Sequence, residues 1–69
     1  MARVSGKVVK LGDVVSFKSD YEQCGQIVGF TTTMMGADVL ILENEDGFDG
    51  EYLDGATRTQ ELASDCWID

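Results

Sequence analysis

The chain lacks histidine and proline, and it contains only two cysteines, Cys24 and Cys66. Without imidazole there is no histidine general base, no Ser-His or Cys-His triad and no mixed Cys/His zinc site. Two cysteines are too few for the disulfide framework of a small secreted domain. We therefore expect two buried, reduced thiols, with a single disulfide between them as the alternative.

Long apolar runs are also absent. No stretch approaches the roughly 20 apolar residues of a membrane span, and residues 1–7 lack the apolar block of a signal peptide. We expect a cytoplasmic protein with no membrane partner and no cofactor.

Basic residues are scarce as well: five Lys and Arg stand against thirteen Asp and Glu, for a net charge of −8. Residues 1–18 hold four of the five cations, whereas residues 19–69 hold one cation and twelve acids. So negative a chain argues against a nucleic-acid partner, because binding to phosphates needs clustered Lys and Arg. Its apolar content of 43% nevertheless predicts a packed core, and its length allows a single domain.

Most of the chain shows the pattern of short strands. Residues 9–18 alternate between apolar and polar positions with a bend at Gly12, and residues 26–30 form a second β-prone run. Residues 37–42 are almost continuously apolar, which predicts a strand at the centre of a sheet. Residues 19–25 are predicted as a polar turn.

The C-terminal segment allows two interpretations. Thr57 and Gln60 fit the capping box of one continuous helix. A single helical turn near residues 62–65, followed by a short strand at residues 66–68, explains the same pattern. We favour the second interpretation because a helix of only about three turns is marginal.

Three segments resemble parts of SH3-like and KOW-type barrels. Lys10-Leu11-Gly12-Asp13-Val14-Val15-Ser16-Phe17 resembles their entry strand, Gly25-Gln26-Ile27-Val28 the second strand, and Asp65-Cys66-Trp67-Ile68 the closing strand. The resemblance implies a mainly β fold, a small SH3-like five-stranded barrel with a short helical turn before the last strand. This barrel is expected to span residues 8–69 as a single domain, after an N-terminal arm at residues 1–7.

Acidic residues concentrate in one segment, which holds Glu43, Glu45, Asp46, Asp49, Glu51 and Asp54. An EF-hand alignment with Gly50 at the sixth position leaves two required ligands missing, so that motif is excluded. We favour a solvated acidic turn, with a weak irregular divalent site as the alternative. Nothing singles out one carboxylate pair for acid–base chemistry, and a domain of this size has little room for a catalytic cleft.

Aromatic residues lie in and near this acidic segment. An exposed Phe48 and Tyr52 ringed by carboxylates would form an anchor with a polar rim, as protein interfaces do. Alternatively, Phe48 folds back and covers one end of the barrel. The candidate partner-binding residues are Phe48, Tyr52, Glu45, Asp46, Asp49, Glu51 and Tyr21.

These features predict a non-enzymatic protein-interaction module that docks through its acidic and aromatic loop onto a basic surface of a larger protein. Residues 43–52 also resemble small uncharacterised proteins of tailed bacteriophages, which implies a host or phage protein as the partner. One alternative is a DNA mimic with two rows of acids along an elongated face. The other is a KOW-like contact with RNA or ribosomes through Arg3, Lys7, Lys10 and Lys18.

Overall fold

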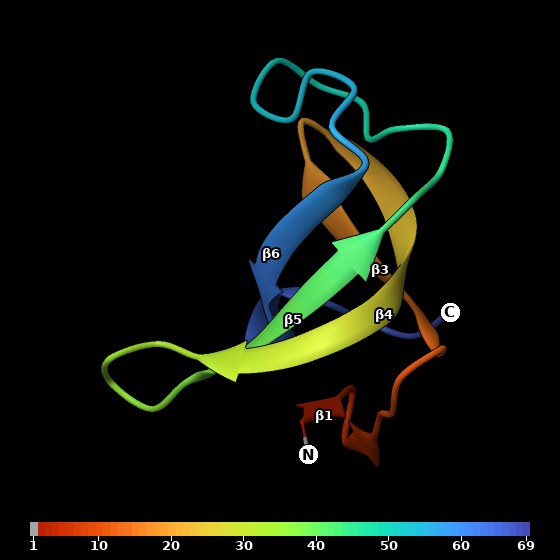
Figure 1. Ribbon diagram of the computed structural model, residues 1–69. Coiled ribbons are helices and arrows are strands. Elements are labelled where there is room, and N and C mark those ends of the chain that lie inside the picture. Colours follow the sequence, from red (N-terminus) through yellow and green to blue (C-terminus); the bar gives the residue numbers. More distant parts are fainter. Residues whose placement is uncertain (1) are drawn as a thin grey trace.

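The computed structural model describes residues 2–69, and the chain in this range is mainly β (Figure 1). The elements are β1 (Arg3–Val4), β2 (Lys7–Val8), β3 (Val14–Ser19), β4 (Tyr21–Thr32), β5 (Asp38–Glu43), β6 (Arg58–Leu62) and the 3-10 helix η1 (Ala63–Asp65). None of the helical structure in residues 2–69 is long and apolar enough to cross a bilayer.

The main sheet is antiparallel, with the strand order β3-β4-β5-β6. The predicted central strand is confirmed, because β5 lies between β4 and β6 and buries Leu40 and Leu42 completely. The predicted polar turn at residues 19–25 is wrong: Asp20 alone makes the turn, with φ of 64°, and β4 begins at Tyr21. The short side chain of aspartate tolerates this left-handed conformation better than most residues do.

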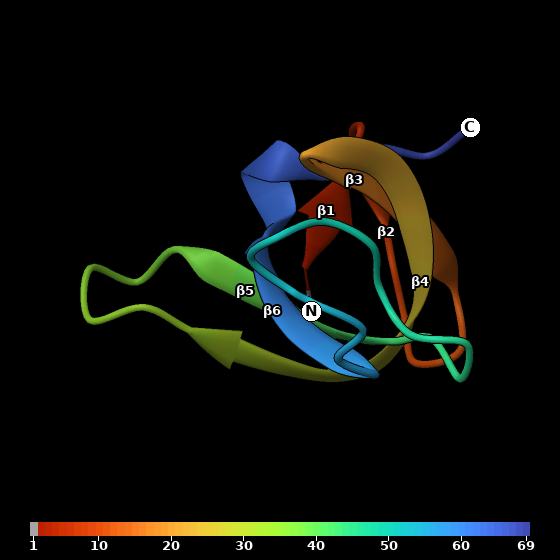
Figure 2. The same ribbon diagram turned by 90° about the horizontal axis from the view of Figure 1, so that it is seen from above.

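The sheet curls strongly, and the hairpin between β4 and β5 projects from the body of the molecule (Figures 1 and 2). A register shift between Ile27 and Gly29 interrupts the pairing of β4 with β5. Such bulges bend a strand and increase its twist. The tip of the projecting hairpin carries Met34 and Met35, both fully exposed.

Residues 2–69 do not form a closed barrel of five strands. The helical turn expected near residues 62–65 is there as η1, but the segment after it contributes one isolated bridge in place of a fifth strand. In this bridge the backbones of Ser16 and Trp67 exchange two hydrogen bonds, of 2.8 and 2.9 Å. Pairing that is limited to Trp67 joins the C-terminal segment to β3 without closing the sheet.

Residues 2–7 do not form an arm outside the domain. β1 and β2 pair as a hairpin whose turn residues, Ser5 and Gly6, both have positive φ, as a type I′ turn requires. Ala2 and Val4 are 2% and 1% exposed and belong to the core cluster. The hairpin is therefore part of the domain, because burial of these apolar side chains holds it against the sheet. Met1 lies outside the described residues.

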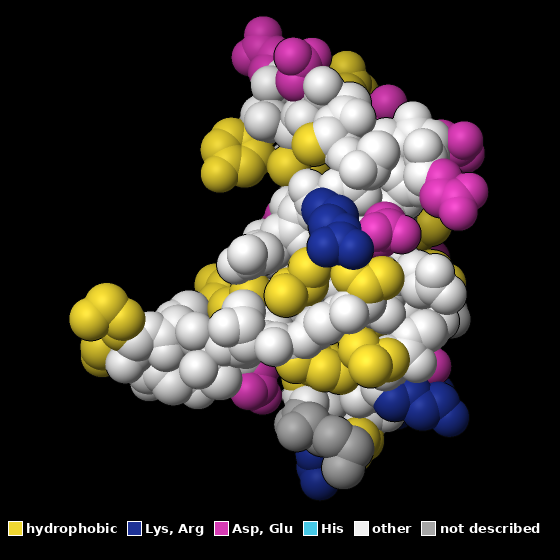
Figure 3. Space-filling view, in the orientation of Figure 1, with side chains coloured by type: hydrophobic (Ala, Val, Ile, Leu, Met, Phe, Trp, Pro, Cys, Tyr) yellow, Lys and Arg dark blue, Asp and Glu magenta, His cyan; other side chains and the backbone are white. Residues whose placement is uncertain are grey.

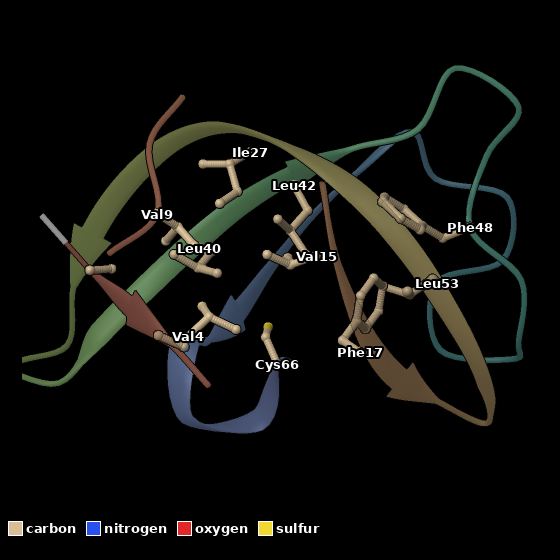
Figure 4. Close-up of a cluster of buried hydrophobic side chains, with 12 residues drawn as sticks. Val4, Val9, Val15, Phe17, Ile27, Leu40, Leu42, Phe48, Leu53 and Cys66 are labelled. Carbon is tan, nitrogen blue, oxygen red and sulfur yellow. The ribbon is translucent and has the colours of Figure 1, made fainter. Parts of the chain in front are cut away.

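The core runs from this hairpin to the opposite end of the sheet (Figure 4). Its members are Ala2, Val4, Val9, Val15, Phe17, Ile27, Leu40, Leu42, Phe48, Leu53, Ala63 and Cys66. Phe48 and Leu53 come from the long connection between β5 and β6, so this connection supplies core side chains as well as exposed acids.

Candidate functional site

The connection between β5 and β6, residues 44–57, is called the acidic loop below. It lies across one end of the curled sheet (Figure 2). Its backbone folds on itself: Phe48 N donates to Ala56 O at 2.8 Å, and Gly55 N donates to Phe48 O at 2.9 Å. The loop is therefore a folded unit with internal hydrogen bonds.

Phe48 anchors the acidic loop from below. Its side chain is 1% exposed and meets Phe17 edge to face, with ring centroids 5.4 Å apart and planes at 68°. Gly25 makes room for it, since a Cβ at this position would lie 3.0 Å from Phe48 Cζ. The prediction that Phe48 is an exposed anchor for a partner is thus wrong, and the alternative, that it covers one end of the core, is confirmed (Figure 4). Burial of a ring of this size is favourable because it removes a large apolar area from water.

Two side chains of the β3–β4 hairpin hold the acidic loop from the side. Gln23 uses both ends of its amide: Oε1 accepts from Asp49 N at 2.9 Å, and Nε2 donates to Asp49 O at 3.1 Å. Asp20 Oδ2 accepts from Glu51 N at 2.8 Å. Between these contacts, Gly50 has φ of 101°, and a Cβ there would lie 2.9 Å from Asp20 Oδ2. Only glycine fits this approach without strain.

The upper surface of the loop is exposed and acidic. All five of its carboxylate side chains face solvent: Glu45, Asp46, Asp49, Glu51 and Asp54. Tyr52 is 85% exposed, and Tyr21 on β4 is 62% exposed. Because Phe48 is buried, the exposed rings at this end of the molecule are the two tyrosines.

Four of the seven candidate residues line two shallow depressions around the loop. Tyr21 and Glu51 line one shallow depression together with Asp20, Gly50 and Asp54. Glu45 and Asp46 line another one, next to β4. Tyr21 thus lies beside the acidic loop. Glu51 and Asp54 line the depression that contains Tyr21, whereas Glu45 and Asp46 line the other one.

The acids of the loop have no cationic neighbours within ion-pair distance in residues 2–69. The ion pair found in this range joins Arg58 Nε to Glu43 Oε2 at 2.9 Å, on the strands below. Acidic side chains crowd the loop end of the molecule, and most of the basic ones lie at the opposite end (Figure 3). Uncompensated like charges at one end create a negative potential that attracts a basic surface.

No group of three or more potential ligand side chains converges on a metal position within residues 2–69.

Both cysteines are free thiols, and their environments differ. Cys66 is buried, whereas Cys24 is exposed, so the expectation of two buried thiols is wrong for Cys24. Burial raises the pKa of Cys66 to about 11, and the nearby carboxylates of Glu61 and Asp65 add to the shift. Desolvation and negative neighbours both disfavour the thiolate, so Cys66 is a core residue and no nucleophile.

Sequence reasoning missed Asp20 and Gln23, the two residues that position the loop. The sequence carries no periodic signal for Gln23, because its partner is the backbone of a residue 26 positions away. Asp20 is the kind of residue that favours a tight turn, which was a usable signal. No protein-family model, curated protein or solved structure matches this chain.

Proposed function

We propose that the protein is a non-enzymatic interaction module whose acidic loop binds a basic surface of another protein. The exposed Tyr21 and Tyr52 would supply the apolar contact, and the carboxylates of the loop the polar rim. Tyrosine suits this role because it offers a large contact area with few rotatable bonds.

The observation that carries the proposal is the way in which the loop is fixed. Phe48 is buried below it, and the backbone N–H groups of Asp49 and Glu51 donate hydrogen bonds to Gln23 and Asp20 at its side. An acidic turn that served solubility alone would not need an anchor in the core. A surface ordered before binding avoids the entropy cost of ordering upon binding.

Several further inferences belong to the same proposal. We infer that the chain is an open variant of the SH3-like barrel, which the strand order, η1 and the bridge between Ser16 and Trp67 support. We also infer a bacteriophage origin and a partner in the host cytoplasm, where the protein would modulate a host or phage protein.

The alternative of a DNA mimic is less favoured. A mimic needs carboxylates spaced like phosphates along an elongated face, whereas these acids gather in one loop of a molecule that measures 27 × 26 × 18 Å. The alternative of an RNA contact relies on Arg3, Lys7, Lys10 and Lys18. Arg3, Lys7 and Lys10 would use the end opposite to the loop, whereas Lys18 lies at the end of β3, near Asp20 and the loop.

Affinity capture from a bacterial lysate with matched variants tests the proposal. The loop variant combines Asp46→Asn with Glu51→Gln, and its control combines Asp38→Asn with Asp65→Asn. Both variants remove two exposed charges, but the control removes them outside the loop. A third variant, Tyr52→Ala, removes the most exposed ring of the loop.

We expect the wild type and the control to retain the same basic protein, and the loop variant and Tyr52→Ala to lose it. Retention should also weaken as salt rises, since surface charges are screened beyond about 8 Å at physiological ionic strength. Equal capture by all four proteins, or capture of RNA in place of a protein, contradicts the proposal.

A further inference from the structure

The main sheet has two edge strands, β3 and β6. β3 is bridged by Trp67 at Ser16, whereas β6 pairs with β5 on one side and has no strand on the other side within residues 2–69. Asn44 N donates to Thr57 O at 2.9 Å. The backbone of Thr57, just before β6, therefore faces the chain that continues from β5. In an antiparallel ladder every second residue bonds to the same neighbour, so the backbone of Thr59 faces β5 as well. The residues whose backbone groups face away from β5 are Arg58, Gln60 and Leu62.

These outward groups form an open edge. In residues 2–69, no backbone hydrogen bond reaches the outward N–H groups of Arg58, Gln60 or Leu62. Leu62 O accepts a weak contact from Cys66 Sγ at 3.4 Å. Natural edge strands are usually blunted by lysine, proline or a bulge. β6 has no lysine, proline or bulge. Its charged residues are Arg58, which is drawn back to Glu43, and Glu61, which pairs with the core residue Leu40.

The outer face beside this edge is partly apolar: Ile41 and Leu62 contribute apolar side chains and Val39 is 8% exposed, whereas Gln60, Arg58 and Glu43 are polar or charged. Leu40 and Leu42 point into the core, so Val39 and Ile41 lie on the other face of β5. Val39 pairs with Leu62 across the strands, and Ile41 pairs with Gln60. Leu62 is 37% exposed, and apolar side chains cover part of the surface of this face in Figure 3. An open edge thus lies next to a partly apolar surface.

Charge is arranged along β6 from one end to the other. The acidic loop leads directly into Arg58, at the start of the strand. η1 follows Leu62 at the other end and contacts β1, whose hairpin segment carries Arg3, Lys7 and Lys10. Glu61 and Asp65 lie at this end as well. A second strand that runs antiparallel beside β6 would therefore bring its acidic end toward an end that holds both the basic hairpin and these two acids.

We propose that β6 pairs with β6 of a second copy to form a symmetric dimer with one continuous eight-stranded sheet. Gln60 faces the same residue of the second copy across the two-fold axis, and Arg58 lies opposite Leu62. Antiparallel pairing of identical strands produces this symmetry by itself. It also places each acidic loop near the basic hairpin of the other copy, which offsets the repulsion between two chains of charge −8.

The expected association is weak, because a five-residue edge with a narrow apolar border is smaller than the roughly 800 Å² per partner of a standard interface. Sedimentation equilibrium at about 0.15 M salt should give a mass that rises from 7.5 kDa toward twice that value as the concentration is raised. The useful range is about 10 μM to 1 mM.

Two variants with the same charge change locate the interface. Gln60→Lys places two lysines opposite each other at the centre of the proposed pairing and should weaken dimerisation at least tenfold. Thr31→Lys adds the same charge to an exposed position of β4, two strands away from the edge, and should leave it unchanged. Circular dichroism of both variants checks that they fold.

A second measurement needs no substitution. The exchange of the Gln60 amide with solvent should slow as the concentration rises, because this N–H gains an acceptor in the dimer. A wild type that stays at 7.5 kDa up to 1 mM overturns the proposal. So does a dimer that Gln60→Lys and Thr31→Lys affect equally.

Discussion

Replacement of Phe48 by alanine tests whether the acidic loop is held by the core. The ring is 1% exposed and packs against Phe17 and the space left by Gly25. Loss of a buried phenylalanine costs about 3–5 kcal/mol of unfolding free energy, because the transfer energy of the ring is lost and a cavity remains. A chain of 69 residues has a total of roughly 3–10 kcal/mol at 0.05–0.15 kcal/mol per residue. Phe48→Ala should therefore lose at least about a third of the unfolding free energy at 25 °C, and it should be unfolded if the wild type lies at the low end of this range.

Urea unfolding, followed by far-UV circular dichroism and by the fluorescence of Trp67, measures this change. Tyr52→Ala is the matched control, since it removes an aromatic ring from the same loop at a position that is 85% exposed. Its unfolding free energy should stay within about 0.5 kcal/mol of the wild type. A loss below about 1 kcal/mol for Phe48→Ala, or equal losses for the two variants, would refute the anchoring role of Phe48.

Four further predictions concern the loop contacts and the thiols. Gln23→Ala removes both hydrogen bonds to Asp49, so we expect a loss of about 1–2 kcal/mol in urea unfolding and faster exchange of the Asp49 amide. Gly50→Ala should cost about 1–3 kcal/mol, because φ is 101° there and the new Cβ would crowd Asp20; a neutral result contradicts the close approach. At pH 8 iodoacetamide should label Cys24 and spare Cys66, as peptide mass spectrometry can verify. The folded pKa of Cys66 is raised to about 11 from 9.0, so the unfolded thiol ionises first, and the unfolding free energy should fall as pH rises from 9 to 11.

The strand content of the fold was predictable from local patterns. The apolar run at residues 37–42 indicated a central strand, and β5 occupies that place. β6 was not predicted, because four of the five residues of Arg58–Leu62 are polar and show no alternation of apolar and polar positions. Thr59 is the buried residue of this strand. Its position in the sheet is determined by pairing with β5. This pairing joins residues that are far apart in the sequence, so it could not be predicted from a local pattern.

The candidate site was predicted in composition but not in arrangement. Exposure of the loop carboxylates followed from their charge, and Tyr52 is exposed as expected. The position of Phe48 could not be decided from its neighbours Gly47 and Asp49, because burial depends on the space between Phe17 and Gly25 on other strands. The same limit applies to residues 2–7, where Ala2 and Val4 are buried by elements distant in sequence.

The central claim is that the acidic loop is an ordered surface fixed to the sheet, and backbone ¹⁵N relaxation tests it most directly. Residues 45–55 should have order parameters near 0.85, equal to those of β4 and β5, because Phe48 and the hydrogen bonds to Asp49 and Glu51 restrain them. Order parameters below about 0.6 across these residues would contradict the account, since a flexible acidic loop presents no fixed surface to a partner.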